Sequence, residues 1–415
     1  MEKLTFTIDG YSFSTAFNTA AKREQCAEKI LSTTGRHYSW YKENTGNKNW
    51  ILYDTEQYEV RNFDDIKYLV LNNRLMDVKT FLCVRRDFKG KLHLPINAST
   101  CSFMFVDSNV PEIDLTEFDT TNVVDMDYMF LEDNLGDCLS LVSSTITQAN
   151  TPDRNILTLN TEGVISMSGM FKDCKVKHLD LRNLRTDNVT DFSDMFCSCN
   201  DLIDLNVDGF DTSKAKDFHG MFQGCIKLTQ LNVKHFNVDN VLHMSCLFSR
   251  CLRLKVINLE SWDFSQVSDA NEMFAYCEKL EKIIANFNFK MIKEMAFMFC
   301  YCTKLSKVDL SHSDLSHVFD FGYAFFKCEG LKEIRFSPGV WRKAKYTLSM
   351  FDNCKALERL NLPDVVLDDV VRSYAMFDDC DSLKEIYMEH PLNLEKYAHG
   401  LIFGNCKAEV KKSTE

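Results

Sequence analysis

The sequence predicts an α/β solenoid, a stack of repeats with a parallel sheet and short helices, preceded by a small α/β N-terminal domain. A Met-Phe-like dipeptide recurs between residues 105 and 403, with its phenylalanine at intervals of 25 or 26 residues apart from one step of 41. A cysteine lies three residues after ten of these twelve phenylalanines. Units this short cannot bury a core alone, so their regular recurrence indicates repeats that stack on one another.

The start of each repeat has the apolar spacing of a helix. Met167, Met170, Phe171 and Cys174 lie at positions i, i+3, i+4 and i+7, which predicts a short helix of about two turns. The recurring phenylalanine and cysteine then form a buried structural ladder, whose members include Phe171, Cys174, Phe196, Cys199, Phe222, Cys225, Phe248, Cys251, Phe274 and Cys277.

The second part of each repeat has the pattern of a strand followed by a turn. Apolar residues alternate with polar ones, as in the pairs Leu205/Val207 and Ile257/Leu259, and alternation at period two predicts a strand. A polar cluster such as Asp211-Thr212-Ser213 comes next. Side chains of these types bond to nearby backbone groups, which is typical of turns.

The repeat resembles a known family in its full pattern, Met-x-x-Met-Phe-x-x-Cys-x-x-Leu-x-x-Leu-x-Leu-x-x-Phe-Asp-Thr-Ser. The clearest copy runs from Asn188-Val189-Thr190-Asp191-Phe192-Ser193-Asp194-Met195-Phe196 to Asp211-Thr212-Ser213. This pattern is similar to the leucine-rich repeats of BspA-like bacterial surface proteins, which are also known from mycoplasma lipoproteins. The resemblance implies a leucine-rich-repeat solenoid with a binding or adhesive role.

The chain divides into three parts by this pattern. Residues 1–95 do not repeat and predict a capping or recruiting domain, with helices at 15–31 and 63–72 and strands at 49–53, 58–61 and 78–84. Residues 96–408 form the twelve-repeat solenoid, whose 41-residue step contains an insertion near 134–154. Residues 409–415 follow the last repeat as a tail.

The charge distribution favours a protein partner with a basic face. Residues 1–100 have 15 Lys and Arg against 12 Asp and Glu, which leaves 33 against 48 for the rest of the chain. An acidic body repels phosphate backbones, so general nucleic-acid binding is disfavoured. The first ten residues do not read as an export signal, and no segment has the ~18 apolar residues of a membrane span. We therefore expect a cytoplasmic chain with reduced cysteines, and an extracellular or surface location is the alternative.

Catalytic and metal chemistry are not predicted. His243 precedes Cys246 by three residues, a spacing that suggests a base and its nucleophile, but both occupy ordinary repeat positions. The ladder cysteines come once per repeat rather than in paired C-x-x-C motifs, so they read as packed thiols and not as zinc ligands. We predict no catalytic residues, no metal and no cofactor.

The outward side of the strands is the predicted binding surface, because the exposed sheet of a solenoid is its usual docking surface. Its candidate residues are Asp180, Arg182, Asp204, Asn206, Asp208, Asn232, Lys234, Asn258 and Glu260. The predicted function is a non-enzymatic scaffold that recognises a protein through this strand face. The alternatives are an intracellular inhibitor or effector that blocks a protein machine, a surface adhesin, and an enzyme within residues 1–95. The sequence names neither the partner nor the oligomeric state.

Overall fold

The computed structural model divides the chain into two compact units, one formed by Met1–Val189 with Leu205–Phe210 and the other by Thr190–Asp204 with Asp211–Glu415. The structure describes residues 4–8, 11–15, 20–34, 38–42, 50–54, 68–70, 91–93, 100–102, 120–131, 155–156, 159–362, 374–388 and 402–412.

The N-terminal elements are two sheets and a helix. Strands β1 (Leu4–Ile8) and β2 (Tyr11–Thr15) form an antiparallel hairpin, and α1 (Ala20–Thr34) follows. A second sheet has the order β3-β4-β5-β6, with the bounds Tyr38–Lys42, Trp50–Asp54, Tyr68–Val70 and Lys91–His93.

The structure confirms the first predicted helix as α1 and the strand at 49–53 as β4. The helix begins later than predicted, because residues up to Thr15 belong to β2. The helix predicted at 63–72 is wrong, since Tyr68–Val70 is β5, with β4 as an antiparallel neighbour and β6 as a parallel one. An apolar run this short fits a strand with neighbours on both sides as well as it fits a helix. The predicted strands at 58–61 and 78–84 and the insertion at 134–154 lie outside the described residues.

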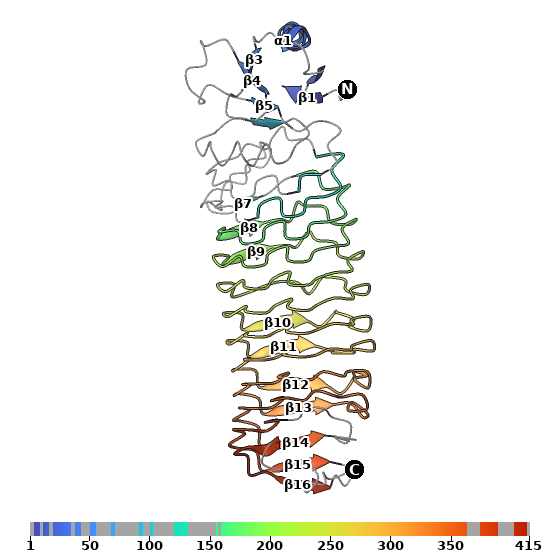
Figure 1. Ribbon diagram of the computed structural model, residues 1–415, viewed down its shortest axis with the longest axis vertical. Helices are drawn as coiled ribbons and strands as arrows, with labels where there is room; N and C mark the ends of the chain where they lie inside the picture. The colour runs from blue at the N-terminus through green and yellow to red at the C-terminus, as the bar shows by residue number, and fades with distance from the viewer. Residues whose placement is uncertain are drawn as a thin grey trace. The chain divides into compact units, whose positions relative to one another are not determined.

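The repeats contribute short parallel strands. The first sheet formed by the repeats has the strand order β7-β8-β9, with the bounds Asn155–Ile156, His178–Asp180 and Asp204–Asn206. The second unit adds β10 to β16, at Val256–Leu259, Lys282–Ala285, Lys307–Leu310, Glu333–Phe336, Arg359–Leu362, Glu385–Met388 and Glu409–Lys412. Figure 1 shows β10 to β16 on the same side of successive rungs, where a rung is one repeat's course of the chain. The predicted repeat solenoid with a parallel sheet is confirmed.

The predicted tail is corrected at its first residues. Glu409–Lys412 forms β16, which pairs in parallel with β15 in the register Ile386↔Val410. Edge strands leave a row of unpaired backbone groups. Here β16 pairs with the backbone groups on the outer edge of β15. The last described strand therefore continues the sheet and does not fray from it.

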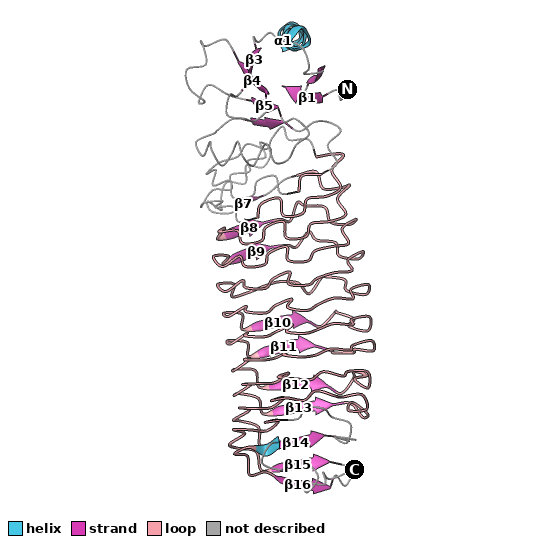
Figure 2. Cartoon of the chain, in the orientation of Figure 1, coloured by secondary structure: helices cyan, strands magenta, loops and turns pink. Residues whose placement is uncertain are grey.

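The predicted short helix at the start of each repeat is wrong for the repeats between residues 169 and 379, because the segment there is a series of tight turns, whereas residues 402–403 of the last repeat are helical (Figure 2). Two residues per repeat, four positions apart, have positive φ, a value that an α-helix excludes. These pairs are Gly169/Asp173, Asp194/Ser198, Gly220/Gly224, Cys246/Arg250, Glu272/Tyr276, Phe297/Tyr301, Tyr323/Lys327, Ser349/Asn353 and Ala375/Asp379. We call the residues around each pair the turn segment.

Backbone hydrogen bonds explain why turns replace the helix. Within a rung, the N–H of Cys199 donates to the carbonyl oxygen of Phe196, three residues earlier, at 3.2 Å. Between rungs, the N–H of Phe196 donates to the carbonyl oxygen of Met221 at 2.8 Å. An α-helix would satisfy its donors internally. The turn segment instead uses alternate donors to bind the next rung, so stacking is hydrogen-bonded on this side as well as in the sheet.

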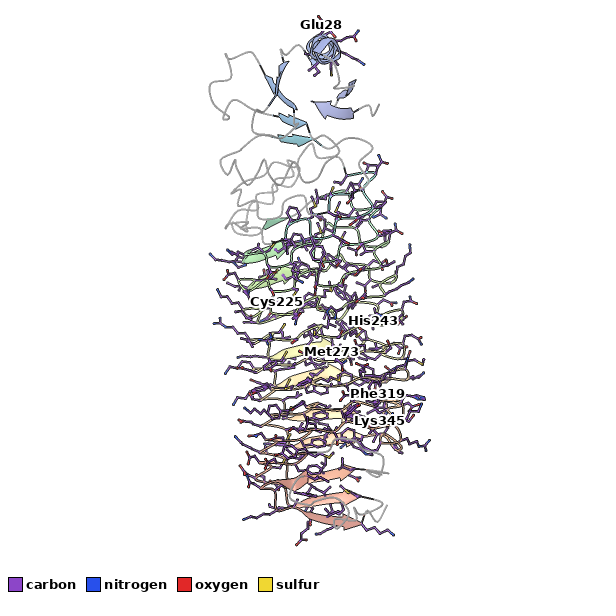
Figure 3. All side chains as sticks on the ribbon, viewed as in Figure 1. Glu28, Cys225, His243, Met273, Phe319 and Lys345 are labelled. Atoms are coloured by element: carbon purple, nitrogen blue, oxygen red, sulfur yellow. The ribbon has the colours of Figure 1, made fainter. Side chains whose placement is uncertain are left out.

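The predicted ladder of phenylalanine and cysteine is confirmed as the core of the repeats. Its phenylalanine rings are fully buried and stack along the rungs, with centroids 5.7 Å apart for Phe222 and Phe248 and 5.4 Å apart for Phe248 and Phe274. Figure 3 draws the side chains and labels Cys225 and Met273, two buried residues of this core. The inward strand residues, such as Ile257 and Leu259, are also buried.

Eight of the ladder cysteines also bond to the preceding rung. The thiol of Cys277 donates to the carbonyl oxygen of Phe248 at 3.1 Å, and that of Cys302 donates to Phe274 at 3.1 Å. A thiol is a weak donor that otherwise packs as a small apolar group. Cysteine therefore fills the site and supplies a hydrogen bond, which explains its recurrence at this position.

Candidate functional site

The structure places most of the predicted strand-face residues on the outside of the sheet. Arg182, Asp208, Asn232, Lys234 and Glu260 are exposed, whereas Asp204, Asn206 and Asn258 are half-buried. The strand face is defined here as these outward side chains and their equivalents on β10 to β16. It brings Lys234 and Glu260 together across neighbouring rungs, with Nζ and Oε2 2.9 Å apart.

Asp180 is the exception among the predicted residues. Its side chain is only 1% exposed, and the Arg182 guanidinium covers its carboxylate in an ion pair. A buried carboxylate needs such a partner to offset its lost hydration. The expected exposed position of Asp180 is therefore corrected, and Arg182 is the member of this pair that reaches solvent.

Two of the predicted asparagines, Asn206 and Asn258, shape the turns that follow their strands. Asn206 Oδ1 accepts a hydrogen bond from the N–H of Asp208 at 3.0 Å, and Asn258 Oδ1 accepts one from Glu260 at 3.0 Å. These contacts are turns in which the side chain imitates a backbone carbonyl. Asn206 and Asn258 therefore hold the chain at the end of each strand, a structural role that the sequence reading did not assign to them.

Ion pairs neutralise much of the strand face in the second unit. Between rungs, Lys307 and Glu333 lie 3.2 Å apart and Arg359 and Glu385 3.0 Å, and within β13 Arg335 and Glu333 lie 2.7 Å apart. Exposed pairs of this kind add at most about 1 kcal/mol each to stability. The predicted strand-face residues between 180 and 260 include four acids and two bases, so this part of the face is acidic in composition.

A second surface, which the sequence analysis missed, lies on the turn segments. Tyr276, Phe297, Tyr301, Tyr323 and Phe326 are half-buried there and form one connected cluster of rings, called the aromatic belt below. Ring centroids are 4.8 Å apart for Tyr276 and Tyr301, and 4.7 Å for Phe297 and Tyr323. The ring of Phe326 meets both Tyr301 and Tyr323 edge-on at 5.5 Å.

Four of the five belt residues have a backbone conformation that costs free energy. Tyr276, Phe297, Tyr301 and Tyr323 have φ of 61°, 59°, 59° and 57°. For a residue with a Cβ, this left-handed conformation costs about 1–2 kcal/mol. The same positions in most other repeats hold small or short polar residues, such as Asp194, Ser198, Gly220, Gly224, Ser349 and Asn353, whereas Tyr128 and Arg250 are exceptions. Ring stacking returns about 0.5–1.5 kcal/mol per pair, which offsets part of this cost.

Charged groups border the aromatic belt on both sides along the rungs. The guanidinium of Arg250 lies 4.9 Å from the Tyr276 ring centroid. Lys327 Nζ lies 4.8 Å from the Tyr301 centroid and donates to its hydroxyl at 3.1 Å. The next two rungs place Asp352, Asp378 and Asp379 at the positions equivalent to Phe326 and Lys327. These three half-buried carboxylates are called the acidic triad below.

The acidic triad holds negative charge that has no ion-pair partner within the described part of the chain. Burial raises the pKa of Asp352, and the nearby carboxylates of Asp378 and Asp379 raise it further. Asp378 Oδ1 accepts hydrogen bonds from the backbone N–H groups of Asp379 and Asn405. Backbone contacts therefore hold the Asp378 carboxylate in place, and all three residues of the triad are half-buried.

The thiols and histidines of the described residues form neither a metal site nor an activated nucleophile. No group of three or more His, Cys, Asp or Glu side chains there is placed to hold a metal ion. Burial, followed by the charges of Glu272 and Asp269, raises the pKa of Cys246 to about 12. That thiol is therefore protonated at neutral pH, which is the opposite of what a nucleophilic cysteine needs.

No helix in the described parts of the chain has the length and apolar character that crossing a membrane requires. A family model described as "Mycoplasma protein of unknown function, DUF285" matches residues 96–137, 139–230, 165–287, 200–312, 242–365 and 279–390. The match confirms the resemblance to mycoplasma repeats that the Met-Phe-x-x-Cys pattern indicated. None of the curated proteins matches the chain.

Two solved structures of repeat proteins resemble the chain. One is a leucine-rich cell surface protein from Faecalibacterium prausnitzii A2-165, with 14% identity, coverage of 61% of this chain and 84% of that chain, and a TM-score of 0.26. The other is a leucine-rich-repeat protein from Eubacterium ventriosum ATCC 27560, with 11% identity, coverage of 76% and 83%, and a TM-score of 0.31. With TM-scores this low, neither structure is a guide to the surfaces of this chain.

Proposed function

This chain belongs to the DUF285 family of mycoplasma proteins, and we propose that it acts as a protein-binding scaffold that docks a partner on the strand face. The observation that supports the proposal is the row of polar side chains on the outward side of parallel strands. Parallel sheets are usually covered on both faces. In solenoids the uncovered sheet is the usual docking surface.

The charge of the strand face favours a partner with a basic patch. Rung-to-rung ion pairs neutralise Glu260, Glu333 and Glu385. Residues 101–415 have 33 Lys and Arg against 48 Asp and Glu, and this net negative charge favours a basic partner. Electrostatic complementarity of this kind sets the orientation and the association rate of a complex. A cytoplasmic location of the complex stays a prediction.

Charge reversal tests the proposal. A partner is first captured from native lysate with the whole chain, and its affinity is then measured for the variant Asp204→Lys, Asp208→Lys, Glu260→Lys. We expect affinity to fall at least tenfold, about 1.4 kcal/mol, because attraction becomes repulsion. Surface changes of this kind alter stability by only about 0.5 kcal/mol, so the melting temperature should stay nearly constant.

The matched control reverses three exposed acids away from the strand face, Asp239→Lys, Glu278→Lys and Asp381→Lys, with the same change in net charge. We expect this control to retain most of the affinity. Equal losses in the two variants would show that only net charge matters. An unchanged affinity of the strand-face variant, with an intact fold, would contradict docking at this surface.

A further inference from the structure

The aromatic belt differs from the equivalent surface of the other repeats. Three consecutive rungs place large rings at positions where most other rungs have small or short polar residues, such as Gly220, Gly224, Ser349 and Asn353, with Tyr128 and Arg250 as exceptions. The left-handed backbone favours those small residues, so the fold itself gives no reason for the rings. Strained residues of this type persist mainly where they serve a function.

The geometry of the rings determines which ligands fit. Tyr276 and Tyr301 stack within 16° of parallel, and Phe297 and Tyr323 within 11°. Each ring therefore covers the face of the next, and ring edges and hydroxyl groups form the accessible surface. A sugar ring would need an open aromatic face. Aliphatic side chains pack well against ring edges, so an apolar peptide segment fits this surface better.

The acidic triad supplies the second part of the recognition. It lies on the two rungs that follow the belt, at the positions that Phe326 and Lys327 occupy in their own rung. The belt and the triad therefore share one face of the second unit. The triad has no cation of its own within ion-pairing distance among the described residues, and a Lys or Arg side chain of a ligand would provide one. The belt cations Arg250 and Lys327 would repel such a side chain from the belt itself.

From these contacts we propose that the aromatic belt and the acidic triad bind an extended peptide segment of a partner protein, with aliphatic residues on the belt and basic residues on the triad. The segment runs along the stacking direction. Rungs are about 4.8 Å apart, so the belt's centre at Tyr301 and Phe326 and the triad are separated by about two rungs, or roughly 10 Å. An extended peptide covers this distance in about three residues. This surface is separate from the strand face and does not depend on the function proposed for it.

Synthetic peptides test the proposal with the full chain. The probe is a fluorescent peptide containing Leu-Leu-Ser-Arg-Arg, in which the leucine pair and the arginine pair are centred three residues apart. It is made in both chain directions. Comparison peptides replace Arg-Arg by Glu-Glu, replace Leu-Leu by Ala-Ala, or insert five further residues between the pairs. We expect one direction of the probe to bind at least tenfold more tightly than each comparison peptide, measured by fluorescence anisotropy.

Two variants assign the binding to the surface. The belt variant Phe297→Ser, Tyr301→Asn, Tyr323→Ser uses residue types that the same turn positions accept elsewhere in the chain, and should lose at least tenfold in affinity. The triad variant Asp378→Asn, Asp379→Asn retains the side-chain oxygens that accept backbone hydrogen bonds, and should remove the preference for Arg-Arg. The control Tyr128→Ser, Tyr387→Ser removes aromatic rings outside the belt and should bind normally.

Each outcome decides the proposal. Equal affinity for the Arg-Arg and Glu-Glu peptides would overturn it, as would a triad variant with an unchanged preference for Arg-Arg. A belt variant that keeps its fold and full affinity would also overturn it. If the belt variant instead melts far below the parent chain, the rings act in stability, and the triad variant alone then decides whether the peptide binds here.

Discussion

Removing one ring from the ladder should uncouple neighbouring rungs. Phe248 is fully buried and stacks on Phe222 at 5.7 Å and on Phe274 at 5.4 Å, with Trp262 at 6.2 Å. Replacing a buried phenylalanine by alanine costs about 3–5 kcal/mol. The two stacked pairs add about 0.5–1.5 kcal/mol each beyond buried area. The expected cost of Phe248→Ala is therefore near the upper limit, about 5 kcal/mol.

Hydrogen exchange measures this cost rung by rung, which suits a repeat array whose unfolding need not be all-or-none. The amide of Phe222 donates to Leu247 at 2.9 Å, and that of Phe248 donates to Met273 at 2.8 Å, so both bonds join the affected rungs. A loss of 4 kcal/mol or more would lower their protection about a thousandfold, since each 1.4 kcal/mol is a factor of ten.

The matched control is Phe319→Ala, the same chemical change at a half-buried position (Figure 3). Its ring leaves little cavity behind, so we expect a cost of about 1 kcal/mol and protection elsewhere in the stack close to that of the parent chain. If Phe248→Ala lowers protection by less than tenfold, or no more than Phe319→Ala, the stacked ladder is not the main source of rung-to-rung stability.

The remaining predictions concern titratable groups. Burial raises the pKa of the Cys251 thiol to about 12, so iodoacetamide at pH 8 should modify it only after unfolding, as followed by mass spectrometry. Rapid modification of the native chain would contradict the buried ladder. Burial also raises the pKa of Asp217, and the nearby charge of Asp191 raises it further. The hydrogen bond from the N–H of His219 and the charge of His243 lower this pKa, but the net shift is upward. A raised carboxyl pKa gives stability that is present below the unfolded pKa and lost as pH rises through the folded one. Asp217→Asn should therefore raise the melting temperature at pH 7 with little effect near pH 3, and a gain that is constant across this range would contradict the assignment.

Much of the repeat architecture follows from the sequence alone. The spacing of Phe196, Phe222 and Phe248 sets the length of a rung, and alternation at Ile257 and Leu259 sets which strand residues face inward. Both patterns are direct records of burial, because a position that faces the core in every repeat accepts only apolar side chains. The positions of the ladder residues and of the inward strand residues were therefore predictable, and the structure confirms them.

Other features depended on contacts between rungs that are distant in sequence. Apolar spacing at Phe192, Met195, Phe196 and Cys199 fits a helix and a series of tight turns equally, and the hydrogen bond from Phe196 to Met221 selects the turns. The burial of Asp180 depends on the orientation of Arg182.

The aromatic belt became visible only in the stack. Tyr276, Tyr301 and Phe326 are 25 residues apart along the chain, and each alone resembles ordinary variation within a repeat. Stacking brings the ring centroids of Tyr276 and Phe326 each within 6 Å of that of Tyr301. The sequence determined which residues each rung contains and which of them face the core. The tertiary structure decided which outward residues become neighbours, because that depends on the hydrogen-bonded register between rungs.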